Sequence, residues 1–126
     1  MYKLSNKSLS RLKGVHPDLV AVVKRAIEVT EQDFSVLEGL RSYERQVELV
    51  NKGASKTMNS RHLTGHAVDL VPYGVSDMWD WQYYYPIADA MKDAAQELDI
   101  DLEWGGDWNS FKDGPHFQLS WRSYDA

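Results

Sequence analysis

The sequence predicts a small α+β domain in which three helices pack on a small, mostly antiparallel sheet. Three segments, beginning near Pro17, Tyr43 and Pro86, place apolar side chains at the spacing of a helix that buries one face. Four short stretches between them are typical of strands; they lie near Phe34, Ala67, Leu102 and His116. With 126 residues and no internal repeat or linker, the chain is expected to form one domain around a single core.

The N-terminal third begins with a polar, serine-rich stretch. Residues 1–13 contain only sparse leucines, so we expect this segment to be loosely packed. Pro17 is a favoured residue in a first helical turn and begins the first helix, which should end near Thr30. The stretch 34–38 is predicted to be the first strand.

The second helix is predicted from a cap and a stop signal. Ser42 can cap its N-terminus, and the helix should run from Tyr43 to about Lys52, before Gly53. We expect its inner face to carry apolar side chains, namely Tyr43, Val47 and Val50.

The rest of the chain supplies the other strands and the third helix. Residues 67–71 alternate enough to form a strand with Asp69 on one face and Val68 and Leu70 on the other. Pro86 begins the third helix, which carries an apolar stripe up to Leu98. Two further strands, at 102–104 and 116–119, complete the sheet.

Composition and charge argue against several classes of protein. The net charge is -5 and no basic block occurs, which argues against nucleic acid as a partner. The chain has no cysteine, so disulfides cannot contribute to its stability. Its first residues lack the apolar run of a signal peptide, and no stretch reaches transmembrane length. We therefore expect synthesis in the cytoplasm and no stable membrane association.

Two histidines and a carboxylate fall within eight residues, in the stretch Ser60-Arg61-His62-Leu63-Thr64-Gly65-His66-Ala67-Val68-Asp69. Zinc binds imidazole nitrogen and carboxylate oxygen, and a catalytic zinc keeps three protein ligands and one open position. His62 and Asp69 are candidates for two ligands. A third should come from a distant part of the chain, and Asp113-Gly114-Pro115-His116 offers a candidate.

The pattern S-x-H-x-x-G-x-A-x-D, followed much later by D-x-x-H, resembles the zinc peptidases of peptidoglycan. These include the VanY-type D-alanyl-D-alanine carboxypeptidases and the L-alanyl-D-glutamate endopeptidases found as phage endolysins. The resemblance runs from about Leu12 to Leu119 and includes the run Trp104-Gly105-Gly106-Asp107-Trp108. It implies a fold of the hedgehog and D-alanyl-D-alanine peptidase type.

The same resemblance implies roles for individual residues. His62, Asp69 and His116 would bind one zinc ion, and Asp113 would be the catalytic base. His66 occupies a variable position of the motif and is left out of the ligand set.

Two further family features assign the remaining site residues. The family pattern G-x-R followed by a glutamine matches Arg41 and Gln46, and the arginine would stabilise the oxyanion. Ser60 and Gln46 would contact substrate. Asp107 either supports a ligand histidine or fixes a turn.

The D-x-x-H motif also indicates which bond of the stem peptide is cleaved. Carboxypeptidases of this family usually have E-x-x-H with tryptophan before the histidine, whereas this chain has Asp113 and Pro115. This resembles the endolysin branch and implies cleavage between L-alanine and D-glutamate of the stem peptide. A D-alanyl-D-alanine carboxypeptidase is the alternative enzyme, and a non-catalytic zinc module that binds the cell wall is the alternative of another class. A glycosidase would not explain two histidines and an aspartate in ligand order.

The resemblance carries further expectations about partners and location. The substrate would be bacterial peptidoglycan, and the chain would act as a monomer. A holin would release it from the host cytoplasm to the periplasm, as for the phage members of the family.

Overall fold

The structure is a computed structural model that describes residues 1–55 and 57–125. Four strands form one antiparallel sheet in the order β1-β2-β4-β3. They are β1 (Phe34–Glu38), β2 (Ala67–Pro72), β3 (Leu102–Trp104) and β4 (His116–Leu119). The helices are α1 (Asn6–Arg11), α2 (Pro17–Val29), α3 (Tyr43–Asn51) and α4 (Tyr84–Glu97). Three 3-10 turns, η1 (Arg61–Thr64), η2 (Trp81–Tyr83) and η3 (Gly105–Asp107), complete the elements of the described residues. The expected α+β fold is confirmed, with one more helix than the sequence predicted.

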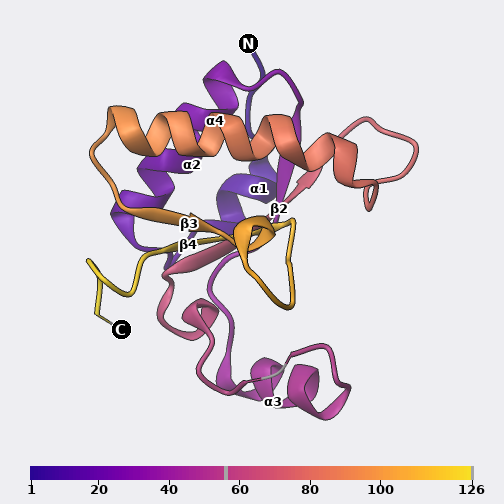
Figure 1. Cartoon of the computed structure of the whole chain (residues 1–126), viewed down its shortest axis with the longest axis vertical. Coiled ribbons are helices and arrows are strands. Elements are labelled where there is room, and N and C mark those ends of the chain that lie inside the picture. The colour runs from indigo at the N-terminus through magenta and orange to yellow at the C-terminus, as the bar shows by residue number, and fades with distance from the viewer. Residues whose placement is uncertain (56, 126) are drawn as a thin grey trace.

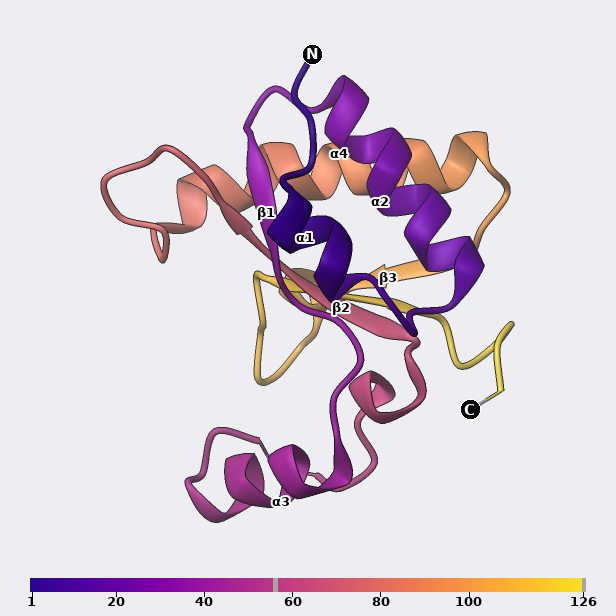
Figure 2. The ribbon, with the colours of Figure 1, turned by 180° about the vertical axis from the view of Figure 1, so that it is seen from behind.

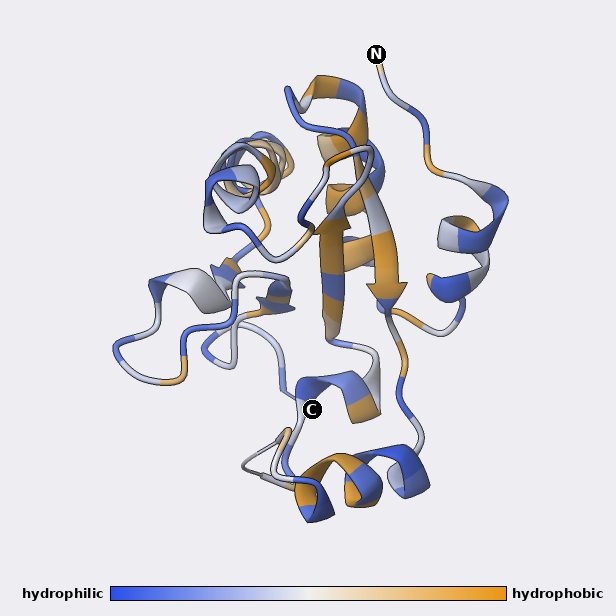
Figure 3. Ribbon diagram, turned by 90° about the vertical axis from the view of Figure 1, so that its right-hand side faces the viewer, coloured by the Kyte–Doolittle hydropathy of each residue, from blue (hydrophilic) through white to orange (hydrophobic). Residues whose placement is uncertain are grey.

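Helices α2 and α4 pack on one face of the sheet, and α3 lies apart from them beyond the sheet's other side (Figures 1 and 2). The core lies between these two helices and the strands. Its members include Leu19, Val23, Leu70, Ile87, Met91 and Phe117, all buried. In Figure 3 the central strands are largely apolar, while the loops around them are mainly polar. The opposite face of β2 and β4 is therefore free to carry polar side chains.

The first 13 residues differ from the expected loose segment. Ser5 caps α1, and the buried hydroxyl of Ser8 accepts a hydrogen bond from the backbone N–H of Val36 at 3.0 Å. Arg11 donates to the carbonyl oxygen of Val36, also at 3.0 Å. Because β1 is an edge strand, α1 satisfies backbone groups that would otherwise be open to pairing. The sequence missed this because the anchors are a serine and an arginine rather than an apolar stripe.

Helix α3 also differs from expectation. Its predicted inner face of Tyr43, Val47 and Val50 is not buried: Tyr43 is 66% exposed, and both valines are only half-buried. Gln46 is the one buried residue of α3, all of whose residues are described. The helix is therefore held by polar contacts from Gln46 rather than by an apolar face.

No helix in the described part of the chain is both long enough and apolar enough to cross a membrane.

Candidate metal centre and active site

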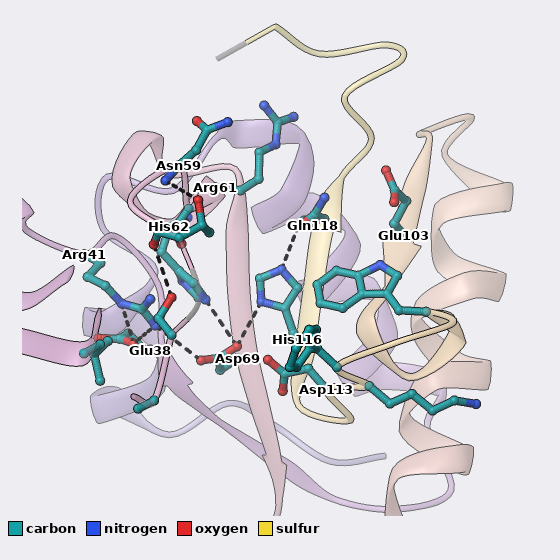
Figure 4. A pocket seen from close by; sticks show the side chains of 18 of the residues that line it. Glu38, Arg41, Asn59, Arg61, His62, Asp69, Glu103, Asp113, His116 and Gln118 are labelled. Atoms are coloured by element: carbon teal, nitrogen blue, oxygen red, sulfur yellow. Dashed lines mark hydrogen bonds and ion pairs between the residues drawn. The ribbon is translucent and has the colours of Figure 1, made fainter. Parts of the chain in front are cut away.

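Three side chains converge on the polar face of the sheet from η1, β2 and β4 (Figure 4). Asp69 on β2 lies directly opposite His116 on β4 in the antiparallel register. His62 is in η1, whose N-terminus is capped by the Ser60 hydroxyl and whose C-terminal Gly65 has a positive φ of 75°. This left-handed residue turns the chain sharply into β2, which brings His62 back over Asp69.

The distances fit a metal ion. His62 Nε2 lies 3.2 Å and His116 Nδ1 lies 3.4 Å from Asp69 Oδ1. The three ligand atoms all lie within 4.8 Å of one another. A tetrahedral zinc with bonds of about 2.0–2.1 Å separates its ligand atoms by about 3.3 Å. The donor set is therefore of the right kind and number for zinc, and both histidine–aspartate distances match its spacing.

The other nitrogen of each imidazole is already hydrogen-bonded. His62 Nδ1 donates to the carbonyl oxygen of Gly39 at 2.8 Å, and His116 Nε2 donates to Gln118 Oε1 at 2.7 Å. In the neutral imidazoles, these bonds select the tautomers in which His62 Nε2 and His116 Nδ1 carry lone pairs toward Asp69. When an imidazole is protonated, the same nitrogen instead donates a hydrogen bond to Asp69. Each histidine is thus oriented by a partner behind it.

The three groups also shift one another's pKa. Burial alone would raise the pKa of the Asp69 carboxyl, but hydrogen bonds from His116 and His62 hold it well below its usual range. Burial alone would lower the pKa of His116, but Asp69 and Gln118 raise it. Asp69 is therefore ionised at any working pH, as a metal ligand must be.

Asp113 points toward the same space from the turn before β4 (Figure 4). The turn is fixed by hydrogen bonds from the Asp113 N–H to the Gly105 carbonyl, 3.0 Å, and from Trp104 Nε1 to the Gly114 carbonyl, 2.7 Å. Burial and then the charge of Asp69 raise the pKa of Asp113, against smaller effects of His116, His62 and Arg41. A partly buried carboxyl with a raised pKa is suited to taking and returning a proton.

Arg41 flanks the opposite side of Asp69. Its Nη2 lies 3.8 Å from Asp69 Oδ2, and its backbone N–H donates to the His62 carbonyl at 2.9 Å. The guanidinium donates twice to Glu38 Oε1 and once, from Nη1 at 2.7 Å, to Gln46 Oε1. A bulge in β1 after Val36 places Glu38 opposite Asp69. Arg41 is thus held with part of its fork directed at the centre.

Gln46, for which the resemblance implied contact with substrate, lies behind Arg41 and does not line the cleft. It is fully buried, accepts from Arg41 and donates from Nε2 to Ser55 Oγ at 2.8 Å and to the Thr57 carbonyl at 2.6 Å. It positions Arg41 and the loop before Ser60. Ser60 itself lines the cleft, while its hydroxyl accepts from the His62 N–H at 3.2 Å.

Two other polar residues lie away from the centre. His66 contacts the Thr64 hydroxyl at 2.7 Å and the ring of His16, so its exclusion from the ligand set agrees with the geometry. Asp107 does not support a ligand histidine; it pairs with Lys92 at 2.8 Å on the surface. The partner of His116 is Gln118, which sequence reasoning missed. Its position two residues after His116 in an alternating strand was the available signal, because such residues share a face.

The centre opens into a cleft of roughly 860 Å³. One wall is formed by α3 and the loop after it, and the other by the η3–β4 loop and the chain after β4. Its lining includes the metal-ligand candidates and three aromatic residues, Trp108, Phe111 and Trp121. The Trp108 ring lies 5.1 Å from the His116 ring, so one aromatic wall directly adjoins the centre.

A His–Asp–His donor set in an open cleft, flanked by a carboxyl and a fixed arginine, defines a metal-dependent hydrolase. The sequence model of the phage L-alanyl-D-glutamate peptidases matches residues 1–120. The chain belongs to this family.

Two L-alanyl-D-glutamate peptidases resemble it over nearly its whole length. The L-alanyl-D-glutamate peptidase of Escherichia phage T5 is 32% identical over 130 residues, covering 99% of this chain and 94% of that protein. The crystal structure of the Serratia marcescens L-Ala D-Glu endopeptidase ChiX has a TM-score of 0.91 and 50% identity, covering 98% of this chain and 95% of ChiX. The D,D-dipeptidase VanXYg shares the fold, with a TM-score of 0.59 and 20% identity over 83% of this chain and 50% of its own.

Proposed function

We propose that this chain is a zinc-dependent endopeptidase that hydrolyses the L-alanyl-D-glutamate bond of the peptidoglycan stem peptide. The observation that carries the proposal is the convergence of His62, Asp69 and His116 beside Asp113 and Arg41. The family match and the 50% identity to ChiX support the choice of bond.

His62 Nε2, His116 Nδ1 and Asp69 Oδ1 would hold the zinc ion. When bound, zinc supplies Lewis acidity that makes water a nucleophile at neutral pH and polarises the scissile carbonyl. The remaining steps belong to side chains of this chain. Asp113 would take the proton of the attacking water on its carboxylate and give it to the leaving nitrogen of D-glutamate. The Arg41 guanidinium would donate a hydrogen bond to the oxyanion as the carbonyl carbon becomes tetrahedral.

Digestion of purified sacculi tests which bond the protein hydrolyses. An L-alanyl-D-glutamate endopeptidase detaches the stem from the sugar strand, so turbidity should fall, with D-glutamate at the new N-termini and L-alanine left on muramic acid. Mass spectrometry of the fragments decides the outcome. Free D-alanine without solubilised peptide would support a carboxypeptidase, and new reducing sugar ends with intact stems would support a glycosidase.

The metal is tested by elemental analysis and chelation. The purified protein should contain about one equivalent of zinc, and zinc should restore the activity that chelation removes. His62→Ala should lose both metal and activity. His66→Ala is the matched control, because His66 lies in the same motif but contacts Thr64, and it should keep both. Full activity of a metal-free protein would contradict the proposal.

The same proposal includes the setting of the reaction. The substrate is peptidoglycan of the host wall, the protein acts as a monomer, and a holin gives it access to the periplasm. Expression in the cytoplasm should then cause lysis only when a holin is co-expressed.

A further inference from the structure

The chain after β4 is fixed beside the cleft. Asp101 accepts from the Arg122 guanidinium at 3.0–3.1 Å and from the Ser123 hydroxyl at 2.8 Å. The Tyr124 hydroxyl donates to Asp18 Oδ2 at 2.8 Å. The family match ends at residue 120, so these contacts involve residues beyond it. These contacts hold the backbone on both sides of Trp121, the residue of this segment that lines the cleft.

Within this segment, Trp121 stacks on Arg61. The Arg61 side chain is 2% exposed, and its Cζ lies 3.9 Å from the centre of the Trp121 ring. Its Nη2 donates to the carbonyl oxygens of Leu119 at 2.8 Å and Tyr124 at 2.9 Å. These two bonds hold the guanidinium plane, and a cation over an aromatic face then holds the ring.

The hydrogen bonding of the Arg61 guanidinium is incomplete. Among the described residues, neither Nε nor Nη1 has a hydrogen-bond partner, although both atoms are buried. Burial lowers the pKa of Arg61, against the longer-range charges of Glu103 and Asp125. A buried guanidinium with two unpaired nitrogens is costly to maintain for stability alone. Its stacking on Trp121 indicates that it fixes this ring.

Trp121 is backed by the cation yet remains 42% exposed and lines the cleft that contains the metal ligands. A flat aromatic face held in one orientation loses little conformational entropy when a ligand stacks on it. Pyranose rings present faces of C–H groups that stack on such surfaces.

The proposed substrate places a pyranose close to the scissile bond. The amino group of its L-alanine is joined through a lactyl group to muramic acid, and one residue spans only about 3.5 Å. A sugar of the glycan strand must therefore lie in the cleft or at its rim. We propose that Trp121, held by Arg61, forms a subsite for a pyranose ring of the glycan strand. This inference rests on the proposed function.

The test compares two substrates that differ only in the sugar. One is the disaccharide tetrapeptide released from sacculi, and the other is the same tetrapeptide with only a lactyl group on the nitrogen of its L-alanine. Trp121→Ala should lower kcat/KM on the first by about three- to tenfold, the usual worth of one aromatic contact, and leave the second unchanged. Trp121→Phe, which keeps an aromatic face, should recover most of the loss. Trp79→Ala is the matched control, because Trp79 is 59% exposed but does not line the cleft, and it should change neither rate.

Binding of the peptide-free disaccharide, N-acetylglucosaminyl-N-acetylmuramic acid, gives an independent readout by calorimetry. The wild type and Trp79→Ala should bind it equally, and Trp121→Ala should bind it more weakly. Equal losses on both substrates, or unchanged binding of the disaccharide, would overturn the subsite. If the wild type cleaves neither substrate, the proposed function fails, and the disaccharide measurement still decides whether the subsite exists.

Discussion

At the scale of single residues, the centre depends on groups behind the ligands as much as on the ligands. The Gly39 carbonyl and Gln118 each accept from one imidazole and so select the nitrogen that faces Asp69. The sequence identified the candidate ligands because their types and spacing are chemically distinctive. It did not identify Gly39, because a backbone carbonyl has no signature, or Glu38, because its importance depends on a bulge in β1.

Removing the partner of His116 should weaken metal binding. Gln118→Ala deletes the acceptor at 2.7 Å, so the ring can rotate or change tautomer, and zinc affinity should fall by roughly 10–100-fold. Competition with a chelator of known affinity measures this. Gln82→Ala, which removes an exposed amide bonded to Asp80, should leave the affinity unchanged. An equal effect of both changes would contradict the role of Gln118.

Glu38 should act through Arg41. Glu38→Ala removes the acceptor of two guanidinium donors, so kcat should fall more than KM rises, with the zinc content retained. The decisive measurement is a double-mutant cycle: in an Arg41→Ala background, Glu38→Ala should have almost no further effect on kcat. Glu48→Ala breaks the exposed pair of Glu48 with Arg45 and is the control without effect. Additive losses in the cycle would show that Glu38 acts by another route.

The catalytic carboxyl gives a separate prediction. Asp113→Asn keeps the shape of the side chain but cannot take a proton, so the rate should fall by about 10²–10⁴-fold while zinc and fold are retained. Metal analysis and thermal melting accompany the rate measurement. A near-normal rate would remove Asp113 from the mechanism and leave Glu103, which also lines the cleft.

At the scale of elements, the strands and the two core helices were predictable, whereas α1 and the packing of α3 were not. Helices α2 and α4 bury regular apolar stripes, which leave a periodic trace in the sequence. Helix α1 is fixed by Ser8 and Arg11, and α3 by Gln46, and such polar anchors leave no periodic trace. The end of α3 was predictable because Gly53, which follows it, has a positive φ of 75°.

Two glycines with a positive φ form a matched pair for substitution. Gly53 and Gly65 both have φ of 75°, but a Cβ on Gly53 would meet nothing within 4 Å, whereas one on Gly65 would collide with the Gly14 carbonyl oxygen. Gly53→Ala should cost about 1 kcal/mol from the left-handed backbone. Gly65→Ala should cost about 1–3 kcal/mol more and lower zinc affinity, because η1 carries His62. Chemical denaturation measures the free energies, and equal costs would contradict the packing.

At the scale of the whole molecule, metal and protons compete for the same side chains. The raised pKa of His116 stabilises the metal-free fold below about pH 6.5, and this contribution is lost as the pH rises through the folded-state value. The lowered pKa of Asp69 stabilises the fold above about pH 3.9 and is lost on acidification. Both contributions to stability are therefore present together between about pH 3.9 and pH 6.5.

The chelated protein should therefore melt at a lower temperature at pH 8 than at pH 5.5. The zinc-loaded protein should show the opposite trend, because zinc needs the neutral imidazoles that higher pH provides. Calorimetry of both forms across this range checks the prediction, with Asp69→Asn as the variant that should flatten both trends. Parallel curves for the two forms would contradict a shared site.

The polar attachment of α3 has a consequence for how the molecule moves. Its one buried residue is Gln46, and the described contacts that hold it to the loop and to Arg41 are hydrogen bonds rather than an apolar interface. Such a segment can open without disturbing the sheet or the core helices. Amide protons of α3 should exchange with deuterium much faster than those of α2 and α4. We therefore expect the wall of the cleft that α3 forms to move away from the sheet and back, which would let a branched polymer enter the cleft from the side.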